Sequence, residues 1–286
     1  SADLMIEGLN SFNNESAGVI EANSGDVYID TTFTNEGEMN VVNGGKLSLG
    51  GNWQNAGTIN LTDGSLYLGG SFATSAIGTL NRQAGTTVRI SGTVDNTGDV
   101  LDLGDVVTLH NNGVIIGGTV HAGLHISYDS ELRDDVTVNG PITFEDYERL
   151  NVDGNLALNG RATLDYRRQQ IRFQSGDRVL TGDSSSEVWL LSDSSSYYAE
   201  LGLEDNTSLT VDANTLIHGE GYVGTRDKSI RTGTSITNYG TIRADRSGDL
   251  DVTPRALTNL GRMESTQSSA DLMIEGLNSF NNESAG

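Results

Sequence analysis

The chain contains no cysteine among its 286 residues and only two prolines, Pro141 and Pro254. The lack of cysteine excludes a disulfide framework, a thiolate zinc site and an iron–sulfur cluster. Proline removes a backbone hydrogen bond wherever it stands inside a sheet, so its scarcity suits a chain that consists mostly of strands. We find no convincing stretch of apolar residues at helical spacing.

Basic residues are also scarce, with 17 Lys and Arg against 39 Asp and Glu and a formal net charge of −22. Because phosphate binding needs a basic surface, this charge argues against nucleic acid as a partner. No apolar run approaches the roughly 20 residues of a membrane-spanning helix. Hydrophobic residues make up 35% and aromatic residues 6%, while glycine contributes 36 residues. Such small side chains argue against a broad globular core.

The first 18 residues, SADLMIEGLNSFNNESAG, return unchanged as residues 269–286. We interpret residues 1–268 as one complete unit of a tandem array and residues 269–286 as the start of the next identical unit. The chain is then expected to begin inside a longer molecule, so the lack of a signal peptide is uninformative. An overlap added by design to protect a solenoid end is the alternative. Under both readings the end of a unit continues into its beginning.

A shorter period of about 20 residues lies inside the unit, and it is clearest in VYIDTTFTNEGEMNV (27–41) and LSLGGNWQNAGTINL (47–61). Each repeat has alternating apolar residues followed by Asn, one residue, and Gly. The recurring asparagines are Asn35, Asn55, Asn96, Asn111, Asn238 and Asn259, and marker glycines include Gly18, Gly37, Gly57, Gly98, Gly240 and Gly261. The period crosses the join between units, because the step after Gly261 leads to Gly286, the copy of Gly18.

The alternation predicts short strands with one apolar face. Leu47 and Leu49 are expected to point inward, with Ser48 between them pointing outward. Strands and turns that repeat every 20 residues or so predict an all-β parallel solenoid in which each turn stacks on the next. A unit would then have roughly 13 turns and extend roughly 60 Å along its axis, given a strand spacing of about 4.8 Å.

The recurring asparagines are expected to form a ladder in which side-chain amides of successive turns hydrogen-bond to each other. Phe33 and Asn35 share strand parity, so both should face the same way. The alternative is that each asparagine serves only its own turn. Residues 124–214 fit the period poorly, and we expect less regular turns with longer loops there. A small inserted lobe is the other possibility.

Candidate chemical sites are few. Asp134 and Asp135 are a candidate carboxylate pair for cleaving an acidic polysaccharide. Arg168 belongs to a separate basic group, with Arg167 and Arg172, that could bind an acidic glycan, although pairing with nearby acids such as Asp165 is the simpler reading. With 39 acidic residues, however, carboxylate clusters arise by default as solvated turns. We find no nucleophile motif and no phosphate-binding loop, so we assign no catalytic residue and expect no enzyme.

Calcium is the only cofactor that the sequence suggests, because closely spaced turn carboxylates offer hard oxygen ligands. The strict nine-residue calcium repeat is missing. The candidate ligands are Asp95, Asp99, Asp102 and Asp105.

The segments FTNEGEMNV, WQNAGTINL, ITNYGTIRA and LIHGEGYVG resemble the rungs of filamentous-haemagglutinin-like and autotransporter-adhesin proteins. The resemblance covers roughly residues 1–120 and 205–286. It implies a right-handed parallel β-helix that is exported to a bacterial cell surface or secreted, with an adhesive or structural role. It carries no catalytic residues to transfer.

We therefore expect a structural segment of an extracellular fibre, such as an adhesin shaft, a sheath or a biofilm matrix filament. Its expected partners are identical units joined head to tail, either covalently or as a filament. Surface glycans or other cells are further candidate partners. The alternative is a carbohydrate-binding or polysaccharide-degrading β-helix protein.

Overall fold

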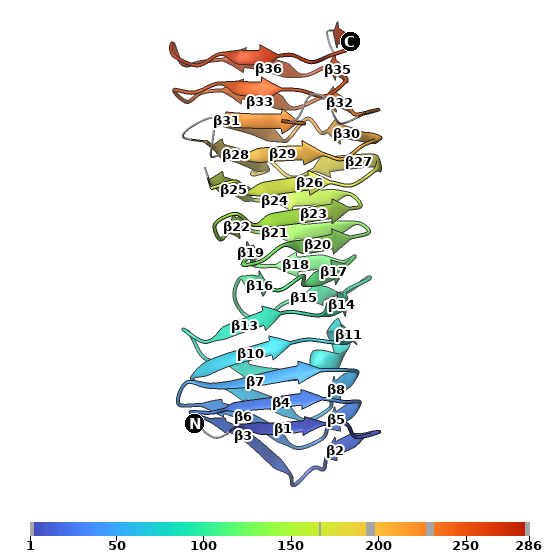
Figure 1. The fold of residues 1–286 in the computed structure, drawn as a ribbon, viewed down its shortest axis with the longest axis vertical. Helices are drawn as coiled ribbons and strands as arrows, with labels where there is room; N and C mark the ends of the chain where they lie inside the picture. Colours follow the sequence, from blue (N-terminus) through green and yellow to red (C-terminus); the bar gives the residue numbers. More distant parts are fainter. Residues whose placement is uncertain (1–2, 166, 193–197, 227–231, 284–286) are drawn as a thin grey trace.

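The computed structural model describes residues 3–165, 167–192, 198–226 and 232–283. This part of the chain contains 38 β-strands and one short 3-10 helix, η1 (Thr74–Ile77). The paired strands run parallel, because each pairs with a strand roughly one turn later in the chain. They form a rod-like coil of about 13 turns with the strands lying across the long axis (Figure 1). The predicted parallel β-solenoid is confirmed.

Each turn contributes strands to three faces, which we number in the order in which the first turn forms them. Face 1 consists of β1 (Leu4–Glu7), β4 (Asp26–Asp30), β7 (Gly45–Gly50), β10 (Gly64–Leu68), β13 (Thr87–Ile90), β16 (Val107–Leu109), β19 (Leu124–Ile126), β22 (Ile142–Phe144), β25 (Arg161–Asp165), β28 (Glu187–Leu191), the first part of β31 (Leu216–Gly224), β33 (Thr241–Ala244) and β36 (Arg262–Ser265).

Face 2 follows face 1 in every turn. It consists of β2 (Phe12–Asn14), β5 (Phe33–Asn35), β8 (Trp53–Asn55), β11 (Ser71–Ala73), β14 (Thr93–Asp95), β17 (Val114–Ile116), β20 (Ser130–Arg133), β23 (Arg149–Asp153), β26 (Gln170–Phe173), β29 (Glu200–Leu203), the second part of β31, β34 (Leu250–Val252) and β37 (Leu272–Ile274).

Face 3 completes the turn. It consists of β3 (Val19–Asn23), β6 (Glu38–Val42), β9 (Thr58–Leu61), β12 (Thr79–Arg82), β15 (Val100–Leu101), β18 (Thr119–His121), β21 (Val136–Asn139), β24 (Leu156–Asn159), β27 (Gly176–Thr181), β30 (Thr207–Val211), β32 (Ser235–Asn238), β35 (Ala256–Asn259) and β38 (Ser279–Asn282). The strand pairing is interrupted after β8 on face 2 and after β12 on face 3, next to η1.

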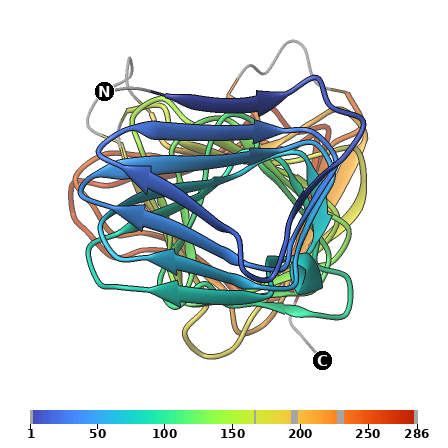
Figure 2. The same cartoon turned by 90° about the horizontal axis from the view of Figure 1, so that it is seen from below.

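The coil is right-handed, as the resemblance implied. Seen from the N-terminal end, the chain winds clockwise as it moves away from the viewer (Figure 2). This is the hand that nearly all parallel strand connections take, because strands twist to the right.

The inside of the coil is filled by apolar side chains stacked in columns. On face 1, Leu47 pairs with Leu66, which pairs with Val88, and all three are at most 1% exposed. Ser48 lies between two inward leucines and points outward, so the predicted strand parity is confirmed. Parallel in-register pairing places residues of the same parity above one another, and this builds one continuous core along the rod.

Face 2 adds an aromatic column near the N-terminal end. The ring centroids of Phe33 and Trp53 lie 6.4 Å apart, and those of Trp53 and Phe72 lie 4.5 Å apart. Trp53 Nε1 donates a hydrogen bond to the carbonyl oxygen of Gly69 at 2.9 Å. The one polar atom of the indole is therefore satisfied inside the core, as burial of tryptophan requires.

The turns differ in length. His110 and Ser127, which contact each other in adjacent turns, are 17 residues apart, whereas Gln170 and Glu200 are 30 residues apart. The turns are still short after residue 124, where Leu124 pairs with Ile142, and they are long from about residue 161 to residue 252, where Arg161 pairs with Glu187 and Gly221 pairs with Leu250. The strands of residues 124–214 nevertheless lie on the same three faces as all the others. The described residues of this segment therefore belong to the coil, and their extra length lies in the corners between strands.

The two ends of the described chain lie at opposite ends of the rod (Figure 1). Apolar side chains are exposed at both ends, because no further turn covers them: Leu4 is 48% exposed and Phe280 is 49% exposed.

Candidate functional site

The corner between faces 2 and 3 carries the first asparagine ladder. Asn14 Nδ2 donates to Asn35 Oδ1 at 2.7 Å, and Asn35 Nδ2 donates to Asn55 Oδ1 at 2.7 Å. Asn55 Nδ2 also donates toward the following turn, to the carbonyl oxygen of Ile77 at 2.8 Å. Asn35 is fully buried, so these bonds replace water that cannot reach the amide.

A second ladder occupies another corner, between faces 3 and 1. Asn238 Nδ2 donates to Asn259 Oδ1, and Asn259 Nδ2 donates to Asn282 Oδ1, each at 2.8 Å. Asn282 is the copy of Asn14, a position that the sequence reasoning had not placed in the ladder. Asn238 and Asn259 also donate to the carbonyl oxygens of Gly240 and Gly261 in their own turns. The amides thus serve both their own turn and the next.

The marker glycines allow the corners to stack closely. A Cβ atom on Gly57 would lie 2.1 Å from the carbonyl oxygen of Gly37, and one on Gly37 would lie 2.2 Å from that of Gly18. A Cβ atom on Gly261 would likewise lie 2.2 Å from the carbonyl oxygen of Gly240. The contact is with backbone, so any side chain here must push two turns apart. Gly286 lies outside the described residues.

Three predicted ladder residues are placed differently. Asn96 is fully buried but donates to the carbonyl oxygens of Gly117 and Thr119, because the next turn has no asparagine at this corner. Asn111 lies in an exposed turn with a φ of 51°, outside either ladder. Gly98 has a φ of 76° and open space around it, so its role is to permit a left-handed turn.

Three of the four candidate calcium ligands make local hydrogen bonds. Asp95 Oδ1 accepts a hydrogen bond from the backbone N–H of Thr97, and hydrogen bonds from the side chain and backbone of Thr97 lower the pKa of Asp95. Asp102 and Asp105 accept hydrogen bonds from the backbone N–H groups of Gly104 and Val106, respectively. Asp105 Oδ2 also lies 3.6 Å from Arg82 Nη2. Asp99 lies in the turn after Asn96. Within the described ranges, no three His, Cys, Asp or Glu side chains are grouped closely enough to hold a metal ion.

Asp134 and Asp135 border an open hollow of about 530 Å³ beside the corner between faces 2 and 3. Asp153 and Arg178 line the same hollow and form an ion pair at 2.6 Å. Arg168 lies in a different corner, between β25 and β26, with a φ of 60°. The structure therefore does not bring Arg168 together with the two aspartates.

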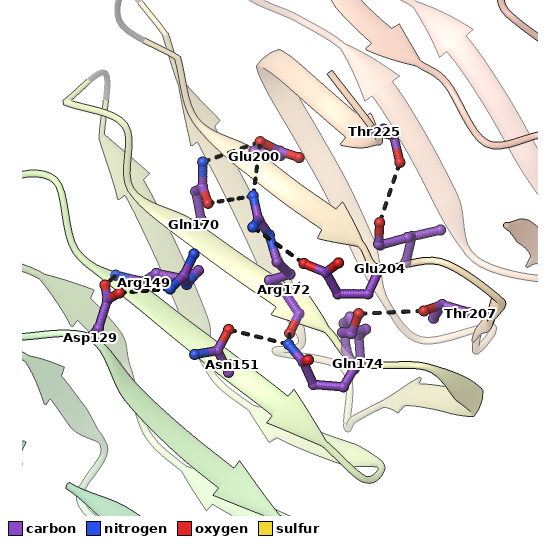
Figure 3. A network of polar contacts seen from close by, with 12 residues as sticks. Asp129, Arg149, Asn151, Gln170, Arg172, Gln174, Glu200, Glu204, Thr207 and Thr225 are labelled. Atoms are coloured by element: carbon purple, nitrogen blue, oxygen red, sulfur yellow. Dashed lines mark hydrogen bonds and ion pairs between the residues drawn. The ribbon is translucent and has the colours of Figure 1, made fainter. Parts of the chain in front are cut away.

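The sequence reasoning missed a polar cluster on the outer side of face 2, which we call the face-2 cluster: Gln170, Arg172, Glu200 and Glu204 (Figure 3). Arg172 Nη1 lies 3.3 Å from Glu204 Oε1, and Arg172 Nη2 lies 3.9 Å from Glu200 Oε2. Glu200 is only 3% exposed and also accepts a hydrogen bond from Gln170 Nε2 at 3.2 Å. Burial of this carboxylate depends on such partners.

Polar pairs continue along face 2 in the neighbouring turns (Figure 3). Asp129 accepts from both the backbone N–H and the guanidinium of Arg149, and Gln174 Nε2 donates to Asn151 Oδ1 at 3.2 Å. Arg172 on β26 lies between the carboxylates of Glu200 on β29 and Glu204 directly after β29, so its charge offsets one of the two negative charges. This arrangement stabilises the wide turns from outside the core. No spacing in the sequence could reveal it, because its partners are separated by turns of unequal length.

A scan against protein-family models finds no match to this chain, and searches of curated proteins and of solved structures find none either. Across the described part of the chain, we find no helix with the length and apolar character needed to cross a membrane.

Proposed function

We propose that this chain is a structural segment of an extracellular fibre of the filamentous-haemagglutinin type, assembled from tandem copies of a 268-residue unit on a bacterial surface or in secreted form. One observation carries the proposal. The recurring residues 269–286 supply β37 and β38, which continue the coil as its next strands. The end of one unit is thus built to become the start of another.

Stacking energetics support a tandem fibre. Each turn of a solenoid is stabilised by its neighbours, so exposed end turns are costly. Covalent repetition leaves only two such ends in the whole molecule. The net charge of −22 would also keep neighbouring rods apart in solution.

The length of purified multimers tests the proposal. Proteins with one, two and three units should form rods whose lengths rise by equal increments in electron microscopy. A single unit should keep its sedimentation coefficient at all concentrations if the array is covalent, and should lengthen with concentration if units associate non-covalently. Compact particles in all three proteins would refute a fibre role.

The second candidate function is glycan binding, and a row of three aromatic rings favours it: Tyr67 on β10 of face 1, and His110 and Tyr128 in the corners that follow β16 and β19. The rings of Tyr67 and His110 meet edge to face at 5.9 Å, as do those of His110 and Tyr128. Tyr128 is 52% exposed, so part of an apolar ring faces the solvent. Glycan-array binding that Tyr128→Ala abolishes and Tyr239→Ala preserves would support this role. Turnover of an acidic polysaccharide would instead support the degrading alternative.

A further inference from the structure

The two identical 18-residue segments occupy different faces of the coil. In the first copy, Leu4–Glu7 forms β1 on face 1 and Phe12–Asn14 forms β2 on face 2. In the second copy, Leu272–Ile274 forms β37 on face 2 and Ser279–Asn282 forms β38 on face 3. The local structure is preserved as strand, corner and strand, while the position around the axis has advanced by one face.

Pairing with the preceding turn defines this position. Leu272 pairs with Leu250 of β34, and Phe280 pairs with Leu257 of β35. The 268 residues between the copies therefore make twelve turns plus one face. Because the turns differ in length, the period of the sequence need not correspond to a whole number of turns.

We propose that a second copy of this unit stacks on the end of the first with a rotation of one face, about a third of a turn in a three-sided coil. The inference rests on the proposed tandem function and specifies its geometry. The second unit's counterpart of β4 covers β37, its counterpart of β5 covers β38, and its counterpart of β3 covers β36.

The two ends complement each other at this register. Leu4 has a neighbour on one side, Val27, and its copy Leu272 has a neighbour on the other side, Leu250. At the join, a single leucine would lie between both neighbours and be buried. The copies Phe12 and Phe280 have Phe33 and Leu257 as their respective neighbours. Leu4, which is 48% exposed, and Phe280, which is 49% exposed, are therefore both covered at the join.

The asparagine ladders meet in the same register. Asn282 accepts from Asn259, while its copy Asn14 donates to Asn35. All bonds run in one direction along the axis. The join therefore merges the two ladders into one continuous series: Asn238, Asn259, Asn282 (the copy of Asn14), then the next unit's counterparts of Asn35 and Asn55.

A rotation of one face at each join distributes surface groups around the rod. The face-2 cluster of one unit would recur on face 3 in the next unit and on face 1 in the third. A fibre of three or more units would present every surface group in all three directions. Repeated groups of this kind allow multivalent binding from any side.

Paired cysteines test the register in the chain as it is, since it contains no native cysteine. Thr258 and Asn281 are neighbours on face 3 in the rotated register. Without the rotation, Asn281 would instead lie on face 2 beside Asp251. Under mild oxidation, we expect T258C/N281C to form a disulfide, read by thiol titration, and the matched variant D251C/N281C to remain reduced. Any other pattern overturns the rotation.

A protein of three units separates this inference from the fibre itself. Val100 is exposed on face 3, so Val100→Cys places one gold label on every unit. Labels on three successive faces in electron microscopy would support the rotation. A straight rod with all labels along one side would overturn the rotation and leave the fibre intact. Particles that are not rods would overturn the fibre.

Discussion

Asparagine suits the corner of a stacked coil because its side chain carries a donor and an acceptor at once. Each amide can accept from the turn before it and donate to the turn after it, which a carboxylate or an ammonium group cannot do. Asn35 shows this use in full, with Asn14 as its donor and Asn55 as its acceptor. A buried column of this kind repeats without any change of chemistry.

We expect Asn35→Ala to destabilise the coil by about 2 kcal/mol or more, because it removes the acceptor that Asn14 Nδ2 meets at 2.7 Å and takes the Asn35 donor away from the buried Oδ1 of Asn55. Asn40→Ala is the matched control: Asn40 accepts from Asn60 on the half-buried outer side, and its loss should cost about 1 kcal/mol or less. Urea unfolding measures the free energy of unfolding of both variants. Equal losses in the two variants would contradict a special role for the inner ladder.

Glu148 provides a pH test at a single residue. Partial burial, reinforced by the nearby charge of Asp129, raises the pKa of Glu148. The folded chain therefore binds this proton more tightly than the unfolded chain, and the associated stability is lost as pH rises through the raised pKa. Glu148→Gln should raise the melting temperature near neutral pH, and the gain should vanish in acid. The exposed Glu36→Gln should not reproduce this dependence.

At the scale of the element, a strand in this coil is short and depends on the strands above and below it. β2, β5 and β8 have three residues each, which is the short end of the usual range of strand lengths. Their stability comes from in-register stacking along the axis. Strands near an end should therefore open more readily than strands in the middle.

Removal of residues 269–286 tests this dependence. The backbone N–H of Leu250 donates to the carbonyl oxygen of Asp271 at 3.0 Å, and this bond would be lost. We expect amide hydrogen exchange to accelerate severalfold in β34 and β35 and to stay unchanged in β19 and β21 near the middle. Uniform acceleration along the rod would indicate that the coil unfolds as one cooperative unit.

At the scale of the whole molecule, charge opposes a compact rod. A net charge of −22 on one elongated body produces repulsion that dissolved salt screens. The core must offset this repulsion through continuous apolar columns. The same repulsion hinders lateral association of rods.

We expect the melting temperature to rise with sodium chloride, and calcium and magnesium chloride to have equal effects at matched ionic strength. Equal effects are expected because the candidate ligands Asp95, Asp102 and Asp105 are engaged in local hydrogen bonds. Scanning calorimetry measures the melting temperature in each of the three salts. A larger rise with calcium alone, reduced by D95N, would reveal a specific site.

The sequence by itself determined the strand period, the inward and outward parity and the recurring corner residues. These are local properties: alternation along a strand follows from its geometry, and a corner with backbone packed on backbone needs glycine. Leu47, Gly57 and Asn35 could thus be placed before the fold was known. So could the continuity of the unit across its join, because the period persists there.

Only the tertiary structure decided which residues of different turns become neighbours. Glu200 meets Gln170 across 30 residues, whereas Ser127 meets His110 across 17, and no fixed period predicts both. Asn111 has the expected spacing yet lies in an outer turn, and the second copy of the repeat lies one face further around the axis. The physical reason is that corners absorb variable numbers of residues at little cost, while core packing and hydrogen bonding between turns select the register.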